Sequence, residues 1–404
     1  MKNIRCAKCG ACTVVCPVYK ASGGMEAYSA RGRNHLASVK EYQHPTPEFE
    51  DIFATCLLCG ACTTACPRGI DVTGETIRAR SRFSRFYGRH GFAKFLARRA
   101  LRHPQVLGPA RRLGKAASRL SRRLPSDSGL RLRLAMFESP EPQDQPAETK
   151  TSPPSRPGME PLVYFPGCSA EYLYPGIANA CRELLADSGH DLVSPDGLGC
   201  CGLALHAAGE IETAKDLARR NIEILEGQRG TVLVSCASCF AHLRQYPELL
   251  AEEPEWRERA AAIGGRLAEM MQFLDRLPAP SVARMEKTGA SPVLRVFYHD
   301  PCHLRHGVGI TKEPRRILGR LPNVELVELP DGPQCCGQGG LFHIGAPELS
   351  AMIRNDLTAR VMKLRPDIVT STCSGCLMQW QTALTAAGSA VRVMHLAELL
   401  RLRA

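Results

Sequence analysis

The sequence lacks three features, and each absence excludes a class of protein. No stretch of 18 or more apolar residues occurs, so there is no candidate for a transmembrane helix. The first residues contain no apolar run of the kind that forms a signal peptide, and we therefore expect a cytoplasmic protein. No Gly-x-Gly-x-x-Gly fingerprint opens a helix, so no binding site for a nicotinamide or flavin dinucleotide is evident.

Cysteine, by contrast, is abundant, with 19 among 404 residues. Because cytosolic thiols are kept reduced, we do not expect these cysteines to form disulfides. Their spacing then decides what they bind.

Two four-cysteine runs lie within residues 1–77, each with the spacing Cys-x2-Cys-x2-Cys-x3-Cys and each followed by proline. A cubane cluster needs four thiolates, and three closely spaced cysteines can wrap one face of it while a more distant one closes the site. In two-cluster ferredoxins the fourth cysteine of each run binds the other cluster. We therefore expect two [4Fe-4S] clusters, one held by Cys6, Cys9, Cys12 and Cys66 and the other by Cys56, Cys59, Cys62 and Cys16.

Zinc is the alternative ligand for these cysteines. Structural zinc sites use Cys-x2-Cys pairs separated by a loop. Two complete four-cysteine runs, each ending in Cys-Pro, do not have that pattern, so the spacing favours a two-cluster ferredoxin-type module.

From residue 162 onward the sequence repeats itself as two halves, 162–277 and 293–404. Short apolar runs alternate with amphipathic helical stretches in both, which predicts βαβ units and parallel sheets. Corresponding cysteines are 134 to 137 residues apart, but Met271 and Met394, which we also pair, are only 123 apart. We therefore expect about 14 extra residues in the first half, around 251–265.

Each half contains five cysteines, two of them adjacent. Adjacent side chains on a strand point in opposite directions, so the Cys-Cys pair must lie in a turn, and the glycines beside it supply the conformational freedom. The two sets are Cys168, Cys200, Cys201, Cys236 and Cys239, and then Cys302, Cys335, Cys336, Cys373 and Cys376.

Between the module and the halves lie a basic segment and a linker. Residues 78–133 hold 17 Lys or Arg and one acid, a net charge of +16, so the rest of the chain nets −4 of the total +12. Apolar residues at helical spacing predict a cationic, amphipathic helix pair broken near Pro104 and Pro109. Residues 92–124 could meet an anionic membrane surface or an acidic partner subunit, or they could be a solvated face; no motif indicates nucleic-acid binding.

The expected organisation therefore has five parts. The fold class is an α+β ferredoxin-type module followed by a duplicated α/β cysteine-rich domain with a pseudo-twofold internal repeat. The parts are the module (1–77), an Arg-rich helical connector (78–137), a Pro-rich linker (138–161) and the two halves (162–277 and 293–404).

The five-cysteine pattern resembles the cysteine-rich CCG domain. That family includes catalytic subunits of heterodisulfide reductases and the iron–sulfur subunits of glycolate oxidase, respiratory D-lactate dehydrogenase and anaerobic glycerol-3-phosphate dehydrogenase. In the heterodisulfide reductase branch such sets hold noncubane four-iron clusters. The resemblance implies one or two further iron–sulfur clusters in residues 162–404, with noncubane type open, and with all ten cysteines of the two halves as ligands.

Four further residues lie close to these motifs. Cys181 falls outside the repeat, on an apparent helix from Ile177 to Leu185, and is interpreted as a small buried hydrophobic residue. His303, His306 and His343 lie near ligand cysteines. We interpret them as structural hydrogen-bonding residues rather than as proton relays.

Two functions remain open. In the first, this chain is the electron-transfer subunit of a 2-hydroxy-acid oxidase or dehydrogenase acting on glycolate or D-lactate. An FAD-containing subunit would supply electrons, and a membrane quinone or another membrane carrier would accept them at the inner face of the cytoplasmic membrane. In the second, the chain is a heterodisulfide-reductase-like catalytic subunit that cleaves a thiol disulfide. A glycerol-3-phosphate dehydrogenase subunit shares nearly every motif.

The first function is favoured by resemblance. The segments His299-Asp300-Pro301-Cys302-His303-Leu304 and Cys335-Cys336-Gly337-Gln338-Gly339-Gly340 look most like those of the glycolate oxidase and lactate dehydrogenase subunits. We expect electron transfer rather than substrate chemistry in this chain, and we identify no catalytic residue in it.

Overall fold

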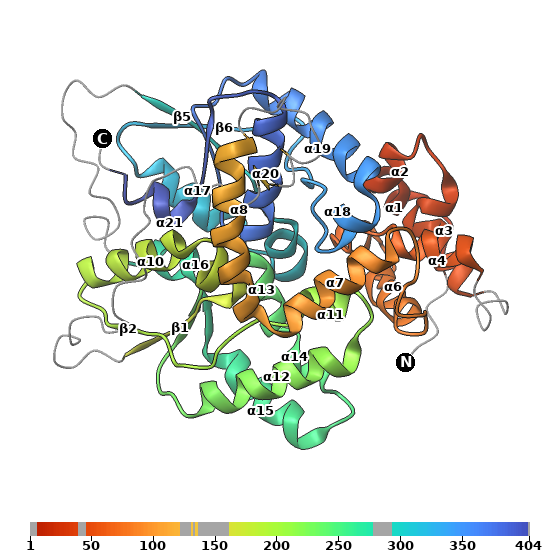
Figure 1. The fold of residues 1–404 in the computed structure, drawn as a ribbon, viewed down its shortest axis with the longest axis horizontal. Helices are drawn as coiled ribbons and strands as arrows, with labels where there is room; N and C mark the ends of the chain where they lie inside the picture. The colour runs from red at the N-terminus through yellow and green to blue at the C-terminus, as the bar shows by residue number, and fades with distance from the viewer. Residues whose placement is uncertain are drawn as a thin grey trace.

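Four segments of the computed structural model are described: residues 6–38, 46–121, 161–277 and 293–402, together with residues 131, 134 and 135. The predicted Pro-rich linker lies outside them except for Pro161. In Figure 1 the N-terminal module is on one side of the molecule, and the two halves with the connector helices form the rest; the C-terminal half packs against the module.

The described part of the module is built from short helices around the eight N-terminal cysteines. No strand occurs in the described residues of this region, which differs from the expected mixture of helix and strand. The cysteine loops are instead held by helices that start directly after them. The elements are α1 (Ala11–Val14), α2 (Pro17–Ala21), η1 (Glu26–Tyr28), α3 (Ala30–Ala37), α4 (Pro47–Ala54), α5 (Ala61–Ala65) and α6 (Val72–Arg80).

The basic connector forms α7 (Gly91–Arg102), the short η3 (Pro104–Val106) and α8 (Leu107–Ser121). The chain breaks at Pro104, as predicted. Pro109 lies in the first turn of α8, where the missing backbone N–H has no helical partner to lose, so the single break of the predicted helix pair is at Pro104.

Helix α7 is inverted relative to an ordinary amphipathic surface helix. Lys94 and Arg98 are buried, with exposed fractions of 4% and 3%, whereas Phe92 and Leu96 are 65% and 52% exposed. Lys94 Nζ donates a hydrogen bond to Tyr87 O at 2.6 Å and lies 4.3 Å from the centre of the Tyr87 ring. The cations therefore fix the helix to the molecule, and its apolar side chains face outward.

The two halves have the same parallel sheet topology, so the expected duplicated α/β fold is confirmed. The strand order is β2-β1-β3-β4 in half 1 and β6-β5-β7-β8 in half 2. The strands of half 1 are β1 (Leu162–Phe165), β2 (Leu192–Val193), β3 (Val232–Val234) and β4 (Leu267–Glu269). Those of half 2 are β5 (Leu294–Tyr298), β6 (Val324–Val327), β7 (Ile368–Ser371) and β8 (Arg392–His395).

Helices cover these sheets and also join the halves to each other. Those of half 1 are η4 (Ser169–Leu173), α10 (Pro175–Asp187), α11 (Leu203–Ala207), α12 (Ile211–Glu226), α13 (Ala237–Leu243), α14 (Tyr246–Leu249), α15 (Pro254–Arg266) and α16 (Met270–Asp275). Those of half 2 are η6 (His303–Val308), α17 (Lys312–Gly319), α18 (Phe342–Gly345), α19 (Pro347–Met362), α20 (Ser374–Ala386) and α21 (Leu396–Leu399).

The extra segment of half 1 is α15, which lies close to where it was predicted and has no counterpart between α20 and β8. The pairing of Met271 with Met394 is wrong, because Met271 lies in a helix and Met394 in a strand. The equivalent residues are Glu269 and His395, each the last residue of its strand and the N-cap of the next helix. The offset falls from 137 at Cys236 and Cys373 to 126 at this pair, so half 1 has 11 extra residues between Cys236 and Glu269.

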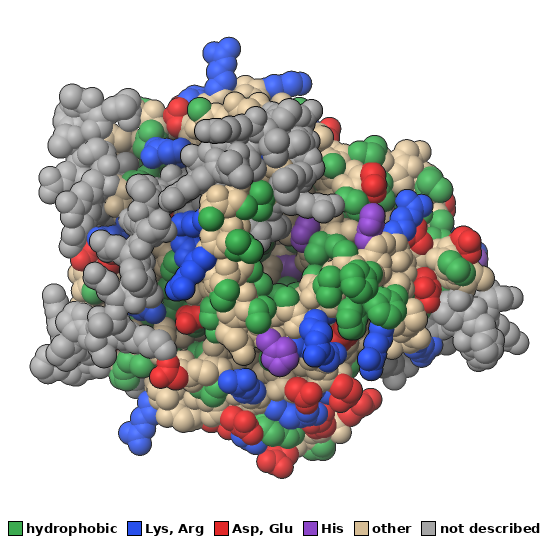
Figure 2. Space-filling view, viewed as in Figure 1, with side chains coloured by type: hydrophobic (Ala, Val, Ile, Leu, Met, Phe, Trp, Pro, Cys, Tyr) green, Lys and Arg blue, Asp and Glu red, His purple; other side chains and the backbone are tan. Residues whose placement is uncertain are grey.

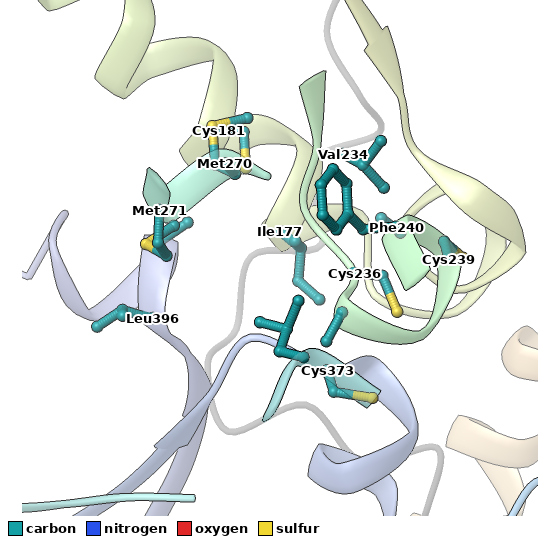
Figure 3. Packing of buried hydrophobic residues seen from close by; sticks show 14 of the residues in the cluster. Ile177, Cys181, Val234, Cys236, Cys239, Phe240, Met270, Met271, Cys373 and Leu396 are labelled. Carbon is teal, nitrogen blue, oxygen red and sulfur yellow. The ribbon is translucent and has the colours of Figure 1, made fainter. Parts of the chain in front are cut away.

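One hydrophobic core runs through both halves. Strands β1 and β3 are buried along their whole length, as is typical of parallel strands covered on both faces. Figure 3 shows part of this core, with Met271 of half 1 beside Leu396 of half 2. Burying each large apolar side chain contributes about 1.5–3 kcal/mol to the stability of the folded state. Because the cluster contains residues of both halves, the halves stabilise each other as one unit.

Candidate metal centres

The two cysteine loops of the module have the same backbone conformation. In each, the residue before the second cysteine has a positive φ, 56° at Lys8 and 54° at Leu58. The glycine after that cysteine does as well, with φ of 81° at Gly10 and 78° at Gly60. Such alternation turns successive N–H groups toward a common point and makes a cradle for an anionic group.

The structure brings the fourth cysteine of each run to the other run. One cavity is lined by Cys6, Cys9 and Cys12 together with Cys66. A second cavity is lined by Cys56, Cys59 and Cys62 together with Cys16. Burial raises the pKa of the Cys62 thiol to about 12, and the neighbouring Cys56 and Cys16 add to that shift. Each cavity therefore has the four sulfur donors that the spacing indicated.

The five cysteines of half 1 gather at the carboxyl ends of its strands. Cys168 follows β1 and Cys236 follows β3, and these neighbouring strands flank the point where the strand order reverses. Ligand sites of open α/β sheets lie at such switch points. Gly167 lies beside them with φ of 65°, and a Cβ built there would be 2.9 Å from Cys239 Sγ, so only glycine fits.

The adjacent cysteines lie in a turn, as predicted, in both halves. Cys200 and Cys201 precede α11, and Gly202 follows them with φ of 87°. The N–H of Gly202 donates to Cys200 Sγ at 3.3 Å. In half 2 the N–H of Gly337 donates to Cys335 Sγ at 3.5 Å, which repeats the same turn.

The five cysteines of half 2 occupy the equivalent places. Cys302 follows β5, Cys373 follows β7 and Cys376 lies in the first turn of α20. Three of the five are almost completely buried: Cys336, Cys373 and Cys376.

The two cysteine sets meet where the halves pack together. The N–H of Ala237 donates to Thr372 O at 2.8 Å, and Ser238 Oγ lies 3.2 Å from Cys373 Sγ. Hydrogen bonding to Cys236 raises the pKa of the Cys373 thiol to about 11. Figure 3 shows the sulfurs of Cys236 and Cys373 facing the same space between the halves.

The module meets half 2 at its cysteines. The thiols of Cys302 and Cys335 lie close enough to Cys59 for their charges to interact. All three line one groove of about 870 Å³ between the module and half 2. A Cβ built on Gly60 would be 3.1 Å from the Cβ of His306, so the backbone of the module approaches half 2 directly. The three cysteine groups therefore lie in the order module, half 2, half 1.

The histidines singled out from the sequence all make hydrogen bonds. His303 Nδ1 lies 2.8 Å from Ser238 Oγ, and His306 Nδ1 lies 3.0 Å from Thr64 Oγ1 of the module. His343 Nδ1 lies 2.7 Å from Gly340 O. Two of the three thus bridge parts of the molecule that are distant in sequence.

Cys181 is apart from all of these groups. It lies in α10, fully buried, beside Met270 in Figure 3 and away from Cys236 and Cys239. Burial raises the pKa of its thiol to about 12. It is a core residue, as interpreted from the sequence.

Sequence reasoning missed one residue, His299, at the end of β5. One of its ring nitrogens and the sulfurs of Cys336 and Cys376 lie within 4.8 Å of one another. Burial lowers the pKa of His299 to about 4, so its ring is neutral. Aligning the halves could have revealed it, because the equivalent residue of half 1, also three before a cysteine, is Phe165.

These donor sets fit iron–sulfur clusters. They consist of thiols that lie in groups, with backbone N–H groups directed at sulfurs and glycines where a Cβ would intrude. When bound, such clusters supply one-electron transfer. The chain contributes the ligands, a buried environment and the close succession of three groups.

Within the described part of the chain, no helix combines the length and the apolar character needed to cross a bilayer.

Comparisons with known proteins agree with this architecture. Residues 2–70 match the family model of a 4Fe-4S dicluster domain, and residues 162–244 and 296–381 each match that of a cysteine-rich domain, CCG. The chain is 30% identical to the probable glycolate oxidase iron-sulfur subunit of Bacillus subtilis (strain 168) over 421 aligned positions, which cover 98% of this chain and 93% of the relative.

Two other relatives match about three fifths of the chain. Lactate utilization protein A of Geobacillus thermodenitrificans (strain NG80-2) is 31% identical over 59% of this chain and 98% of its own length. One subunit of the fumarate reductase (CoM/CoB) of Methanothermobacter marburgensis is 33% identical over 59% of this chain and 45% of its own length.

Proposed function

We propose that this chain, which belongs to the family of the glycolate oxidase iron–sulfur subunit, is the electron-transfer subunit of a 2-hydroxy-acid oxidase or dehydrogenase. Its substrate would be glycolate or D-lactate, oxidised by a separate FAD-containing subunit. A membrane quinone or another membrane carrier would accept the electrons. The observation that carries this proposal is the succession of three cysteine groups in one molecule, because a relay needs its centres close together.

The ligand sets proposed for these centres follow the grouping of the thiols. In the module, two [4Fe-4S] clusters would be held by Cys6, Cys9, Cys12 and Cys66, and by Cys56, Cys59, Cys62 and Cys16. In each half the five cysteines would hold one further cluster. Their burial excludes water and favours sites that exchange electrons without exchanging ligands.

The outward face of the connector supports a peripheral membrane location. Phe92 and Leu96 of α7 are exposed beside Phe86, which is 53% exposed, and Arg99 and Arg102 lie on the same helix. Figure 2 shows hydrophobic side chains gathered next to basic ones over α7. Exposed aromatic and basic residues together suit the anionic interface of a bilayer, which would bring the chain to a membrane carrier.

Vesicle sedimentation tests this location. A Phe92→Ser/Leu96→Ser variant should lose binding to anionic vesicles, whereas Met352→Ser, which removes an exposed apolar residue elsewhere, should not. If the wild-type protein does not bind these vesicles, or if the double variant binds as well as wild type, the membrane contact is excluded. Loss of a co-purifying subunit in the double variant would instead assign this face to a protein partner.

The function itself is tested by anaerobic purification of the tagged protein from its native host. The eluate is assayed for flavin and for dye reduction driven by glycolate, D-lactate or glycerol-3-phosphate. A co-purifying flavoprotein active on a 2-hydroxy acid is expected, and Cys59→Ser should reduce that activity while Cys181→Ser should not. An eluate without flavin that reduces a thiol disulfide from a chemical electron donor would contradict the proposal.

A further inference from the structure

His299 is held rigidly at the carboxyl end of β5. Its N–H donates to Thr370 O at 2.8 Å, and its carbonyl accepts a hydrogen bond from the Ser371 hydroxyl at 2.9 Å. The ring packs edge-to-face on Trp380, with ring centres 5.8 Å apart, and only 2% of the residue is exposed. The backbone and the indole together fix where the imidazole lies.

The imidazole faces the thiols of half 2. One ring nitrogen, Cys336 Sγ and Cys376 Sγ lie within 4.8 Å of one another. Ligands of one tetrahedral metal ion, with bonds of about 2.0–2.3 Å, are roughly 3.5–4 Å apart. The three atoms can therefore bind one metal ion with small side-chain adjustments.

No other role engages the nitrogens of this ring. Among the described residues, neither ring nitrogen of His299 has a hydrogen-bond partner, in contrast to His303 and His343. The buried Nε1 of the adjacent Trp380 also has none in the described part of the chain. Buried polar atoms of native proteins are normally paired, so the indole N–H of Trp380 indicates a group that binds here.

Half 1 lacks this feature. The residue three positions before Cys168 is Phe165, fully buried and without a donor atom, while Cys201 and Cys239 match Cys336 and Cys376. Because the two sheets have the same order and the cysteines the same places, the difference concerns the ligand set and not the fold.

We propose that His299 is a nitrogen ligand in half 2 and binds the same iron as Cys336 and Cys376, so that half 2 has a mixed histidine and cysteine site and half 1 a purely thiolate one. This rests on the proposed iron–sulfur cluster of half 2. A neutral imidazole adds no negative charge to the site, unlike a thiolate. The identity of the ligands sets the reduction potential of an iron–sulfur cluster, so the two halves should differ in potential.

Pulsed electron paramagnetic resonance on the holoprotein tests the proposal. The signal of half 2 is identified by its loss in the Cys335→Ser/Cys336→Ser variant. With the wild-type protein, that signal should show the coupling of a directly bound nitrogen, and this coupling should change when the histidines are labelled with ¹⁵N. The wild-type measurement does not depend on the folding of any histidine variant.

Three variants then assign the nitrogen. His299→Phe, which copies half 1, should abolish the coupling and shift the potential of half 2 while five thiols remain to retain its iron. His303→Gln and His343→Gln should leave the coupling in place. Phe165→His is the reverse change and should shift the potential of half 1 in the opposite direction.

The outcomes separate this inference from the proposed function. If half 2 contains iron but its signal has no strongly coupled histidine nitrogen, His299 is not a ligand and the function stands. The same holds if the coupling persists in His299→Phe. If iron analysis finds no iron in half 2 of the wild-type protein, the proposed cluster and the histidine ligand are both refuted.

Discussion

The two halves of this chain share a strand order and five cysteine positions, yet the surroundings of their thiols differ. Half 2 has His299 where half 1 has Phe165, and half 1 has Ser238 where half 2 has Gly375. Ser238 lies against Cys373 of the other half, and Gly375 has no side chain that could do the same for Cys236. A duplicated scaffold can therefore keep its ligands and still make two unlike sites by changing single neighbours.

The halves also differ in what they touch. Half 2 meets the module through Cys302 and Cys335, next to Cys59. Half 1 meets the connector and the last residue of α6: Tyr87 Oη donates to Ala208 O at 3.0 Å, Arg98 pairs with Glu210 at 3.0 Å, and Arg80 Nη1 donates to Ala207 O at 2.6 Å. Of the three cysteine groups, that of half 2 contacts both others, so half 2 is central and half 1 terminal in the series.

The largest expected effect comes from breaking one half at a time. Cys335→Ser/Cys336→Ser should remove the iron of half 2 and also separate half 1 from the module, so substrate-driven dye reduction by the complex should be lost. Cys200→Ser/Cys201→Ser should remove only the terminal site and leave half 2 reducible, as seen by its resonance signal. If half 1 stays reducible after half 2 has lost its iron, just as half 2 stays reducible after half 1 has lost its own, the serial order is refuted.

The next largest effect should be a loss of stability when the contact between the connector and half 1 is broken. Arg98 is 3% exposed, and its ion pair with Glu210 joins α7 to half 1. Removing Arg98 should cost about 2 kcal/mol, because its buried ion pair with Glu210 is lost while Arg102 still pairs with that carboxylate. Thermal unfolding of Arg98→Ala should show that loss, whereas Arg99→Ala, an exposed neighbour, should unfold like wild type.

Glu269 and His395 occupy equivalent N-cap positions but should respond to pH with opposite sign. Burial raises the pKa of Glu269 to about 8, so the folded state keeps its proton while the unfolded state releases it, and stability falls as pH rises toward 8. Burial lowers the pKa of His395 to about 4, so stability falls as pH decreases from 6.5 toward 4.

Replacing the carboxyl group of Glu269 isolates its contribution to the pH dependence of stability. Between pH 6 and pH 8 the wild-type protein should lose about 2 kcal/mol relative to Glu269→Gln, since one pKa unit corresponds to about 1.4 kcal/mol. Unfolding temperatures at both pH values measure the difference. Glu248→Gln, at an exposed position of α14, is the control. If the stability of the wild-type protein changes with pH in the same way as that of Glu269→Gln, the raised pKa of Glu269 is contradicted.

The smallest expected effect concerns Ser238, which half 1 contributes to a cysteine of half 2. A hydrogen bond of about 1 kcal/mol to a ligand sulfur corresponds to about 40 mV for a one-electron couple. Ser238→Ala should lower the potential of half 2 by that amount and leave half 1 unchanged, as measured by a redox titration followed by resonance. An equal shift in both halves would indicate a general packing change.

Local patterns predicted much of the site. The exchange of Cys16 and Cys66 between the runs, the turn at each Cys-Cys pair and the position of each half's sheet all follow from spacing and periodicity within short segments. Cys181 could also be distinguished from the ligand cysteines, because it is the only cysteine of its predicted helix and lies outside the repeat.

The rest depends on contacts between distant segments. Helix α7 buries Lys94 and Arg98 because Tyr87 and Glu210 lie beneath it, which its own pattern does not reveal. The roles of Ser238 and His299 arise only when two halves or two strands are packed together. The pairing of Met271 with Met394 was wrong because two similar methionines lie on different elements.

Iron and acid-labile sulfide per chain, measured on the anaerobically purified wild-type protein, test the central claim most directly. Two cubane clusters account for about eight irons, and clusters in both halves must add to them. We predict clearly more than eight, falling to about eight when Cys200, Cys201, Cys335 and Cys336 are all replaced by serine. A wild-type value of eight, unchanged by those replacements, would contradict a relay that runs through both halves.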